Sequence, residues 1–186
     1  MYLIGDLVIY GGSNCVCEIT DITGLDFPDI DRDRLYYVLK PLNQNCVIYN
    51  PTDNTDMLMR RVISREEAEA LIDTIPEIKA EIYQGNEFKK IVEHYESIIK
   101  TRDCAKLIEL TISLYSKKKF LLNNNRRFSA QEDMFMKRAE EMLFGELSVA
   151  LDIQRECVPS YIAARVGRKR EGQQCENGGT LAANHL

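Results

Sequence analysis

The sequence predicts an α+β protein, with a small antiparallel β-barrel at residues 1–62 and an all-α domain of about five helices at 63–156. Three observations lead to this prediction. Short apolar runs separated by turn residues fill the first third of the chain, whereas apolar residues recur at helical spacing beyond it. The sign of the charge also reverses between the two parts. A chain of 186 residues, 45% of them hydrophobic, is long enough to form two small cores.

Four apolar runs predict the strands of the barrel, and turn residues bound each of them. The runs are Leu7–Tyr10, Cys15–Ile19, Leu35–Lys40 and Cys46–Tyr49. Gly11–Asn14 and Pro41–Asn45 provide turns, and Pro51 ends the last run. Because no helical segment separates these short runs, we expect the strands to pair antiparallel in a small barrel. Its sheet edge or its mouth is available to bind a partner.

Cap signals indicate where the helices of the second part start. Ser64–Glu67 and Ser129–Glu132 both have the Ser-x-x-Glu pattern of a capping box, in which the two side chains satisfy backbone N–H groups. Asn86 and Asp103 are residue types that cap two further helices. Gly145 is expected to break the helix that begins at Ser129 and to start a final short one. These signals predict about five helices.

Helical periodicity decays after residue 156. Pro159 and the basic segment Gly167–Arg170 lie in a stretch without a sustained apolar pattern. We expect residues 157–186 to form a flexible tail, which either keeps the chain soluble or adds nonspecific affinity for DNA.

The net charge of −5 hides an asymmetry along the chain. Residues 1–64 contain nine acidic and five basic side chains, whereas residues 89–138 contain twelve basic and six acidic ones. Two adjacent arginines, Arg126 and Arg127, fall in a polar segment just before Ser129. Basic side chains at a fixed corner between helices favour contact with phosphate groups. The second part is therefore predicted to face nucleic acid, with a merely solvated helical surface as the alternative.

The six cysteines do not have the spacing of a metal site. One residue separates Cys15 from Cys17, rather than the two typical of a zinc knuckle, and both histidines are remote in the sequence. The chain has no export signal at its start and no run of about 20 apolar residues that would predict a membrane span. We expect a cytoplasmic protein with reduced, packed thiols and no metal ion.

Catalytic motifs are absent from the sequence. It contains no Gly-rich phosphate loop, no HExxH helix and no GxSxG turn, and His94 has no evident nucleophile to serve. Carboxylates such as Glu66 and Glu67 are placed as partners of a helix N-terminus. The protein is not expected to be an enzyme or to bind a cofactor.

Several segments of the first part form a recognisable series. They are the pattern Gly-Asp-x-Val-x-Tyr over Gly5–Tyr10, then Gly12–Cys17, Tyr37–Lys40, and the strand that ends at Pro51. Together they resemble the Tudor-like RNA-polymerase-interacting domain of the CarD/CdnL family of bacterial transcription regulators. In the second part, Phe128–Glu132 and Gly145–Leu147 extend the resemblance over roughly residues 1–153. Related proteins that carry a helicase are excluded because the chain has no ATPase motif.

The resemblance implies a Tudor/SH3-like barrel and a function in transcription. In the family, the barrel binds the RNA polymerase β subunit, and the helical domain reaches promoter DNA at the upstream edge of the melted region. There an aromatic side chain, typically Trp, wedges into the minor groove and stabilises the open complex without sequence-specific reading. Phe88 has that position here, although its place in an apolar stripe is equally consistent with a core residue.

The resemblance and the charge pattern together give the predicted site. The predicted DNA-binding residues are Phe88, Lys89, Lys90, Arg126, Arg127, Lys137 and Arg138. The predicted polymerase-binding residues are Val47, Ile48, Tyr49 and Pro51. Two departures from the family pattern weaken the expected contacts. Asp133 and Met134 stand where basic residues are frequent, and Tyr49 stands where the family often has an arginine that contacts the polymerase.

Two other functions remain possible from the sequence. The protein could be a barrel-plus-helices adaptor that binds another protein and does not act on DNA. It could also be a metal or redox protein that uses Cys15, Cys17 and Cys46.

Overall fold

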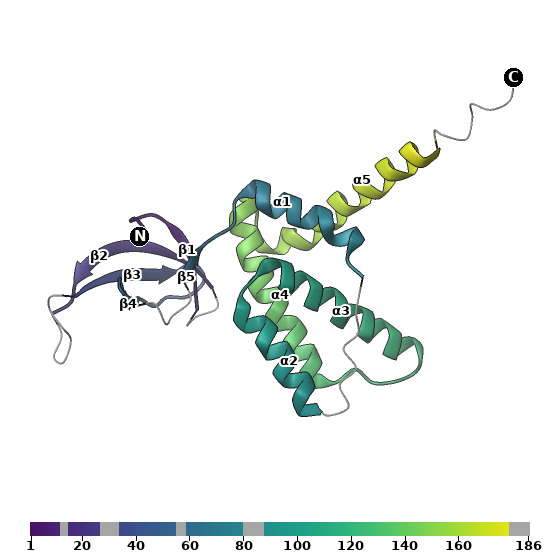
Figure 1. Cartoon of the computed structure of the whole chain (residues 1–186), viewed down its shortest axis with the longest axis horizontal. Helices are drawn as coiled ribbons and strands as arrows, with labels where there is room; N and C mark the ends of the chain where they lie inside the picture. Colours follow the sequence, from purple (N-terminus) through teal and green to yellow (C-terminus); the bar gives the residue numbers. More distant parts are fainter. Residues whose placement is uncertain (12–14, 27–33, 55–58, 80–87, 179–186) are drawn as a thin grey trace, which may run out of the picture. The chain divides into compact units, whose positions relative to one another are not determined.

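Figure 1 shows the computed structural model of the chain, which describes residues 1–11, 15–26, 34–54, 59–79 and 88–178, with side chains up to residue 168 except that of Phe88. The chain divides into two compact units. We call Met1–Ile63 the strand unit and Ser64–Leu186 the helical unit, and we describe each by itself.

Where the structure describes it, the strand unit is a five-stranded antiparallel sheet. Its strands are β1 (Leu7–Tyr10), β2 (Cys15–Gly24), β3 (Leu35–Pro41), β4 (Ile48–Pro51) and β5 (Met59–Arg61). They are ordered β4-β3-β2-β1-β5 across the sheet. A register shift between Ile19 and Asp21 marks an irregularity in β2, which increases the local twist of a strand. No ladder joins β4 to β5 in the described ranges, so the sheet is open there.

One face of this sheet forms the core of the strand unit. Val8 is opposite Cys17, Ile19 is opposite Leu39, and Leu39 is opposite Ile48, so these side chains share a face. The buried cluster consists of Val8, Tyr10, Cys17, Ile19, Tyr37 and Leu39. The short apolar runs between turn residues thus predicted four of the five described strands, although β2 extends to Gly24 and β4 begins at Ile48 rather than at Cys46.

The sequence analysis did not predict β5. Met59–Arg61 has two arginines in three residues and lacks an apolar alternation. It pairs with β1, and the Tyr2 hydroxyl donates a 2.6 Å hydrogen bond to the Met59 carbonyl. Backbone pairing and this long-range bond hold the strand, and neither has a signature in the local sequence.

The described residues of the helical unit form five α-helices, which makes the protein α+β as predicted. They are α1 (Arg65–Thr74), α2 (Phe88–Thr101), α3 (Cys104–Asn123), α4 (Ala130–Leu151) and α5 (Val158–Gly178), with 3₁₀ turns η1 (Ile75–Glu77) and η2 (Arg155–Cys157). The capping box of Ser64 and Glu67 is present at the start of α1. Asp103 caps α3 by accepting hydrogen bonds from two backbone N–H groups. The predicted cap Asn86 lies outside the described residues.

Gly145 does not break α4, contrary to the prediction. The helix runs without interruption to Leu151, and the left-handed Asp152 (φ 54°) ends it. Leu147 and Leu151, which follow Gly145 at helical spacing, are fully buried. Burying two leucines stabilises the helix by more than the roughly 1 kcal/mol that a helical glycine costs relative to alanine.

The expectation of a flexible tail after residue 156 was wrong for the segment that forms α5. Val158 is fully buried, and Arg165 forms ion pairs with Asp73 and Glu69 of α1. Figure 1 shows α5 beginning beside α1. Polar contacts dock this helix, which explains why apolar periodicity failed to predict it.

Candidate nucleic-acid interface

The predicted DNA contacts come from three places in the helical unit. Lys89 and Lys90 lie in the first turn of α2, Arg126 and Arg127 in the α3–α4 connection, and Lys137 and Arg138 about two turns into α4. Figure 1 shows α2 and α4 starting at the same end of the helical unit. Lys89, Lys90, Arg126 and Arg127 therefore lie at neighbouring helix ends, whereas Lys137 and Arg138 lie farther along α4.

A helix-capping motif builds the connection that carries the two arginines. Asn125 has a left-handed φ of 53°, its N–H donates to the Leu122 carbonyl, and the N–H of Arg126 donates to the Leu121 carbonyl at 2.8 Å. These two bonds are those of a Schellman motif, in which asparagine is an accepted substitute for glycine. The backbone of Arg126 is thus fixed against the end of α3, while the side chains of Arg126 and Arg127 are exposed.

Nearby carboxylates already neutralise some of the basic side chains. Asp133 forms ion pairs with Lys118 at 2.7 Å and with Lys137 at 2.9 Å. The hydrogen bond from Lys118, and next that from Lys137, lower the pKa of Asp133, and Asp133 raises the pKa of Lys137. The side chain of Lys89, which is 87% exposed, lies 3.9 Å from Glu93. Lys137 and Lys89 are therefore weaker candidates for phosphate contact than the arginines.

Lys119, Arg126, Arg127 and Arg138 remain as exposed cations. No ion pair with an acidic side chain involves any of them in the part of the chain that the structure describes. Lys119 was not among the predicted site residues. Its position relative to the buried leucines of α3 indicates exposure, and that signal was available in the sequence.

The second predicted capping box is wrong, and its glutamate has another role. Ser129 is the N-cap of α4, but its side chain makes no capping hydrogen bond. Glu132 is instead buried, and its Oε1 accepts hydrogen bonds from Lys117 Nζ at 2.7 Å and from the Tyr95 hydroxyl at 3.2 Å. A buried carboxylate needs such partners, and this need outweighs a local cap. The three residues join α2, α3 and α4.

Phe88 is the first residue of α2, and its side chain lies outside the described residues. Its predicted role as a wedge in DNA stays a prediction. Elsewhere in the unit, Tyr115 and Phe120 of α3 each expose more than half of their surface. Neither was among the predicted site residues. Helical spacing from Leu107 and Ile108 places Tyr115 in the apolar stripe of α3, so its exposure is contrary to that pattern.

The predicted polymerase contacts lie at the β4 edge of the sheet. Val47, just before β4, and Tyr49 are 52% and 45% exposed, whereas Ile48 between them packs against the core. Pro51 is partly buried and ends the strand. β4 pairs with β3 on one side, and no second strand pairs with it in the described ranges. An exposed tyrosine on an edge strand provides a rigid, partly apolar contact for a protein partner.

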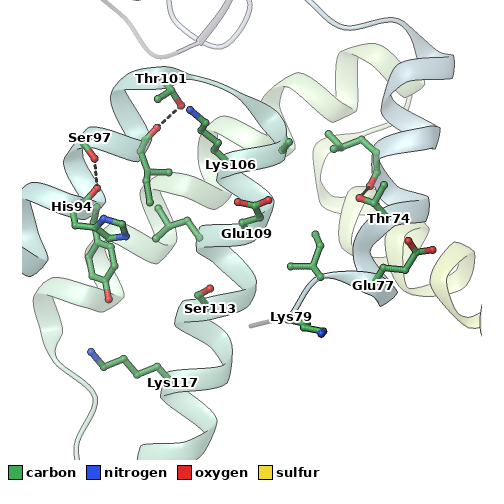
Figure 2. A pocket seen from close by; sticks show the side chains of 16 residues that line it. Thr74, Glu77, Lys79, His94, Ser97, Thr101, Lys106, Glu109, Ser113 and Lys117 are labelled. Atoms are coloured by element: carbon green, nitrogen blue, oxygen red, sulfur yellow. Dashed lines mark hydrogen bonds between the residues drawn. The ribbon is translucent and has the colours of Figure 1, made fainter. Parts of the chain in front are cut away.

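A cavity of about 910 Å³ lies between α1 with η1 on one side and the α2–α3 hairpin on the other (Figure 2). Its titratable lining residues are Glu77, Lys79, His94, Lys106, Glu109 and Lys117. Figure 2 shows hydroxyl groups of Ser97 and Thr101 bonded within their own helix, to the carbonyls of His94 and Ile98. Both hydroxyl groups thus donate to the backbone of α2.

No disulfide bond joins the cysteines whose side chains the structure describes, which are Cys15, Cys17, Cys46, Cys104 and Cys157. Cys15 Sγ and Cys17 Sγ are 3.8 Å apart. No three His, Cys, Asp or Glu side chains gather as metal ligands in the ranges that the structure covers. Among the same residues, no helix is both long and apolar enough to cross a membrane.

No protein-family model matches the chain, and no curated protein matches it significantly. The resemblance to CarD/CdnL proteins thus depends on the segments named above, and stays a prediction. What the geometry provides is an end of the helical unit with exposed cations and a sheet edge with exposed apolar side chains.

Proposed function

We propose that this protein is a transcription regulator that binds the RNA polymerase β subunit through its strand unit and stabilises the open promoter complex through its helical unit. The strand unit would be a Tudor/SH3-like module, and the protein a non-enzymatic member of the CarD/CdnL type. The order of the two units and the segments that resemble the family support this proposal.

The main support for DNA contact is the set of exposed cations around the α3–α4 connection. Arg126 is positioned by the Schellman motif, and Arg127 and Lys119 are exposed near it without an acidic partner in the described residues. Arg138 is exposed in the same way about two turns into α4. Fixed cations attract phosphate groups without reading the sequence of bases. Such contacts suit a regulator that acts at many promoters.

Stabilisation of the open complex requires only differential binding. A protein that binds melted promoter DNA more tightly than closed DNA shifts the equilibrium towards opening, and no ATP is needed. A tether to the polymerase raises the effective concentration of the helical unit at the DNA, so weak contacts suffice.

Copurification of the full-length chain with the isolated β subunit tests the proposal most directly. We expect a stoichiometric complex, and we expect Tyr49→Ala to weaken it about tenfold, because an exposed aromatic anchor at an interface typically contributes about 1–2 kcal/mol. Leu42→Ala, which removes another exposed apolar side chain of the strand unit, is the matched control. Failure of the unmodified chain to bind the β subunit would overturn the proposed function.

A further inference from the structure

The C-terminal half of α3 exposes large apolar side chains beside basic ones. Tyr115, Phe120 and Leu122 are 55%, 57% and 57% exposed. Lys119, just before Phe120, and Asn123, just after Leu122, are also exposed. We call these five residues, with Arg126 and Arg127, the basic aromatic surface. Three exposed large apolar side chains thus fall within residues 115–122, two of them on one side of the helix and Phe120 on another, and this local concentration favours an interaction surface over ordinary surface scatter.

The helix geometry orders these side chains around α3. With about 100° per residue, Tyr115, Lys119, Asn123 and Phe120 follow one another over roughly 140° of the helix circumference. The order is an aromatic ring, an ammonium group, an amide and a second aromatic ring. The buried Leu107, Leu110 and Leu114 lie on the opposite side of α3. Cys104 and Ile108, which are within about 20° of Tyr115 around the helix, are also buried, so this arc is exposed only in the C-terminal half of α3, from Tyr115 onwards.

The charge of this surface is entirely positive. Residues 111–131 contain five lysines and arginines and no aspartate or glutamate. Lys117 and Lys118 are paired with Glu132 and Asp133, which belong to α4. Lys119, Arg126 and Arg127 have no acidic partner in the described residues. A ligand that matches this surface is therefore polyanionic and has flat apolar groups.

We propose that the basic aromatic surface binds single-stranded nucleic acid, with Tyr115 and Phe120 stacking on bases while Lys119, Arg126 and Arg127 contact phosphates. Aromatic rings flanked by cations are how proteins hold single strands, because the bases of a duplex already stack on one another. This inference rests on the proposed function, and it assigns the melted strand, rather than the duplex, to this surface.

The distribution of apolar side chains favours a nucleic acid over a membrane. A helix that lies in a lipid interface has a continuous apolar face, with its charges on the opposite face. Here Lys119 and Asn123 lie between the two aromatic residues on the same arc. Binding to anionic vesicles is thus the competing outcome in the test.

Fluorescence anisotropy of the full-length chain tests the inference, with a labelled 15-nucleotide oligothymidine and a 15-base-pair duplex as probes. The variant Tyr115→Ala/Phe120→Ala is expected to lower affinity for the single strand about tenfold or more, because each stacked base contributes that much. Its affinity for the duplex and its salt dependence should not change. Tyr115→Phe/Phe120→Tyr keeps both rings and should retain the affinity, and Leu42→Ala is the control for an exposed apolar residue elsewhere.

The cations are tested with Lys119→Ala/Arg126→Ala/Arg127→Ala. This variant should reduce the slope of log affinity against log salt by about 2 for the single strand, since each lost phosphate contact contributes about 0.7. The inference is overturned if the ring-deleting variant binds oligothymidine as before or loses affinity equally for both probes. Variant-sensitive binding to phosphatidylserine vesicles without binding to oligothymidine would also overturn it.

Copurification with the β subunit, run in parallel, separates this inference from the proposed function. If the chain binds oligothymidine but does not bind the β subunit, only the proposed function is overturned. Polymerase binding without any affinity for oligothymidine overturns only the inference about α3.

Discussion

Glu132 shows how one buried side chain fixes the relative position of three helices. Its Oε1 accepts hydrogen bonds from Lys117 and Tyr95, and the Tyr95 ring also packs edge-on against Phe135 at 5.6 Å. A buried carboxylate that loses its partners is costly, so the native packing of α2, α3 and α4 is favoured over alternatives in which Glu132 is unpaired. The network lies next to the helix ends that carry the predicted DNA contacts.

Removing this carboxylate should destabilise the helical unit. Glu132→Ala leaves Lys117, whose side chain is 18% exposed, without its ion pair. We expect a loss of about 3 kcal/mol in the free energy of unfolding, the lower end of the range for breaking a buried pair. Urea denaturation followed by circular dichroism measures it. The exposed Glu141→Ala on the same helix is the matched control, and an equal loss in both variants would contradict this role of Glu132.

The ion pairs of Asp133 lead to a prediction about how stability depends on pH. Its pKa is lowered by hydrogen bonds from Lys118 first and Lys137 second. Its pairing therefore contributes stability above the unfolded-state pKa of about 3.9, and this contribution is lost as pH falls through the folded-state value. An NMR titration should give a midpoint for Asp133 below that of an ordinary aspartate, and Lys118→Ala should raise it. A midpoint that Lys118→Ala leaves unchanged would contradict the pairing.

At the scale of elements, the ion pairs between α5 and α1 explain why a segment without apolar periodicity is helical. Arg165 donates to both Asp73 oxygens, at 2.7 and 2.8 Å, and Tyr161 donates to Glu69. The hydrogen bonds to Asp73 raise the pKa of Arg165, so the guanidinium stays charged. Such a bidentate contact also gives a defined geometry, which single point charges do not.

Replacing the guanidinium should release the start of α5. Arg165→Lys keeps the charge but cannot form the bidentate contact with Asp73, and Arg165→Ala removes the charge and the contact. We expect hydrogen exchange of amides in residues 158–168 to accelerate, more in the alanine variant, with a loss of about 2 kcal/mol from that variant's helical unit. Arg168→Ala is the control because Arg168 bonds only to the Ala164 carbonyl among the described contacts. Unchanged exchange in Arg165→Ala would show that apolar packing at Val158 alone docks the helix.

These elements also show what local sequence patterns predict and what they miss. Two Ser-x-x-Glu patterns predicted two capping boxes, and the structure contains the one at Ser64 but not the one at Ser129. The difference is Lys117, which competes for Glu132 from a neighbouring helix. Short apolar runs bounded by turn residues predicted β1 to β4, whereas β5 and α5 depend on long-range pairing and ion pairs. The exposure of Phe120 could have been found from the helical phase of α3, because Phe120 lies away from the buried residues of that helix. Tyr115 has the phase of the buried Ile108, so the same pattern predicts burial there and is wrong.

At the scale of the whole molecule, the proposed function assigns different tasks to the two compact units. The strand unit has an apolar sheet edge and an excess of acidic side chains, and the helical unit has exposed cations around the α3–α4 connection. If the strand unit binds the polymerase and the helical unit contacts DNA, polymerase binding raises the effective concentration of the helical unit at the promoter. The contributions of the two units to the stability of the open complex are then linked. Independent binding of two unrelated partners would show no such linkage.

A double-variant cycle on the lifetime of the open complex tests this linkage. Arg126→Ala/Arg127→Ala should shorten the lifetime without changing copurification with the β subunit, because these side chains are not in the strand unit. Tyr49→Ala should also shorten it, while affinity for free oligonucleotides stays the same. When polymerase binding is lost, the helical unit is no longer concentrated at the promoter, so the arginine substitutions should have little further effect. Fully additive losses would instead show that the helical unit reaches the promoter without the polymerase contact.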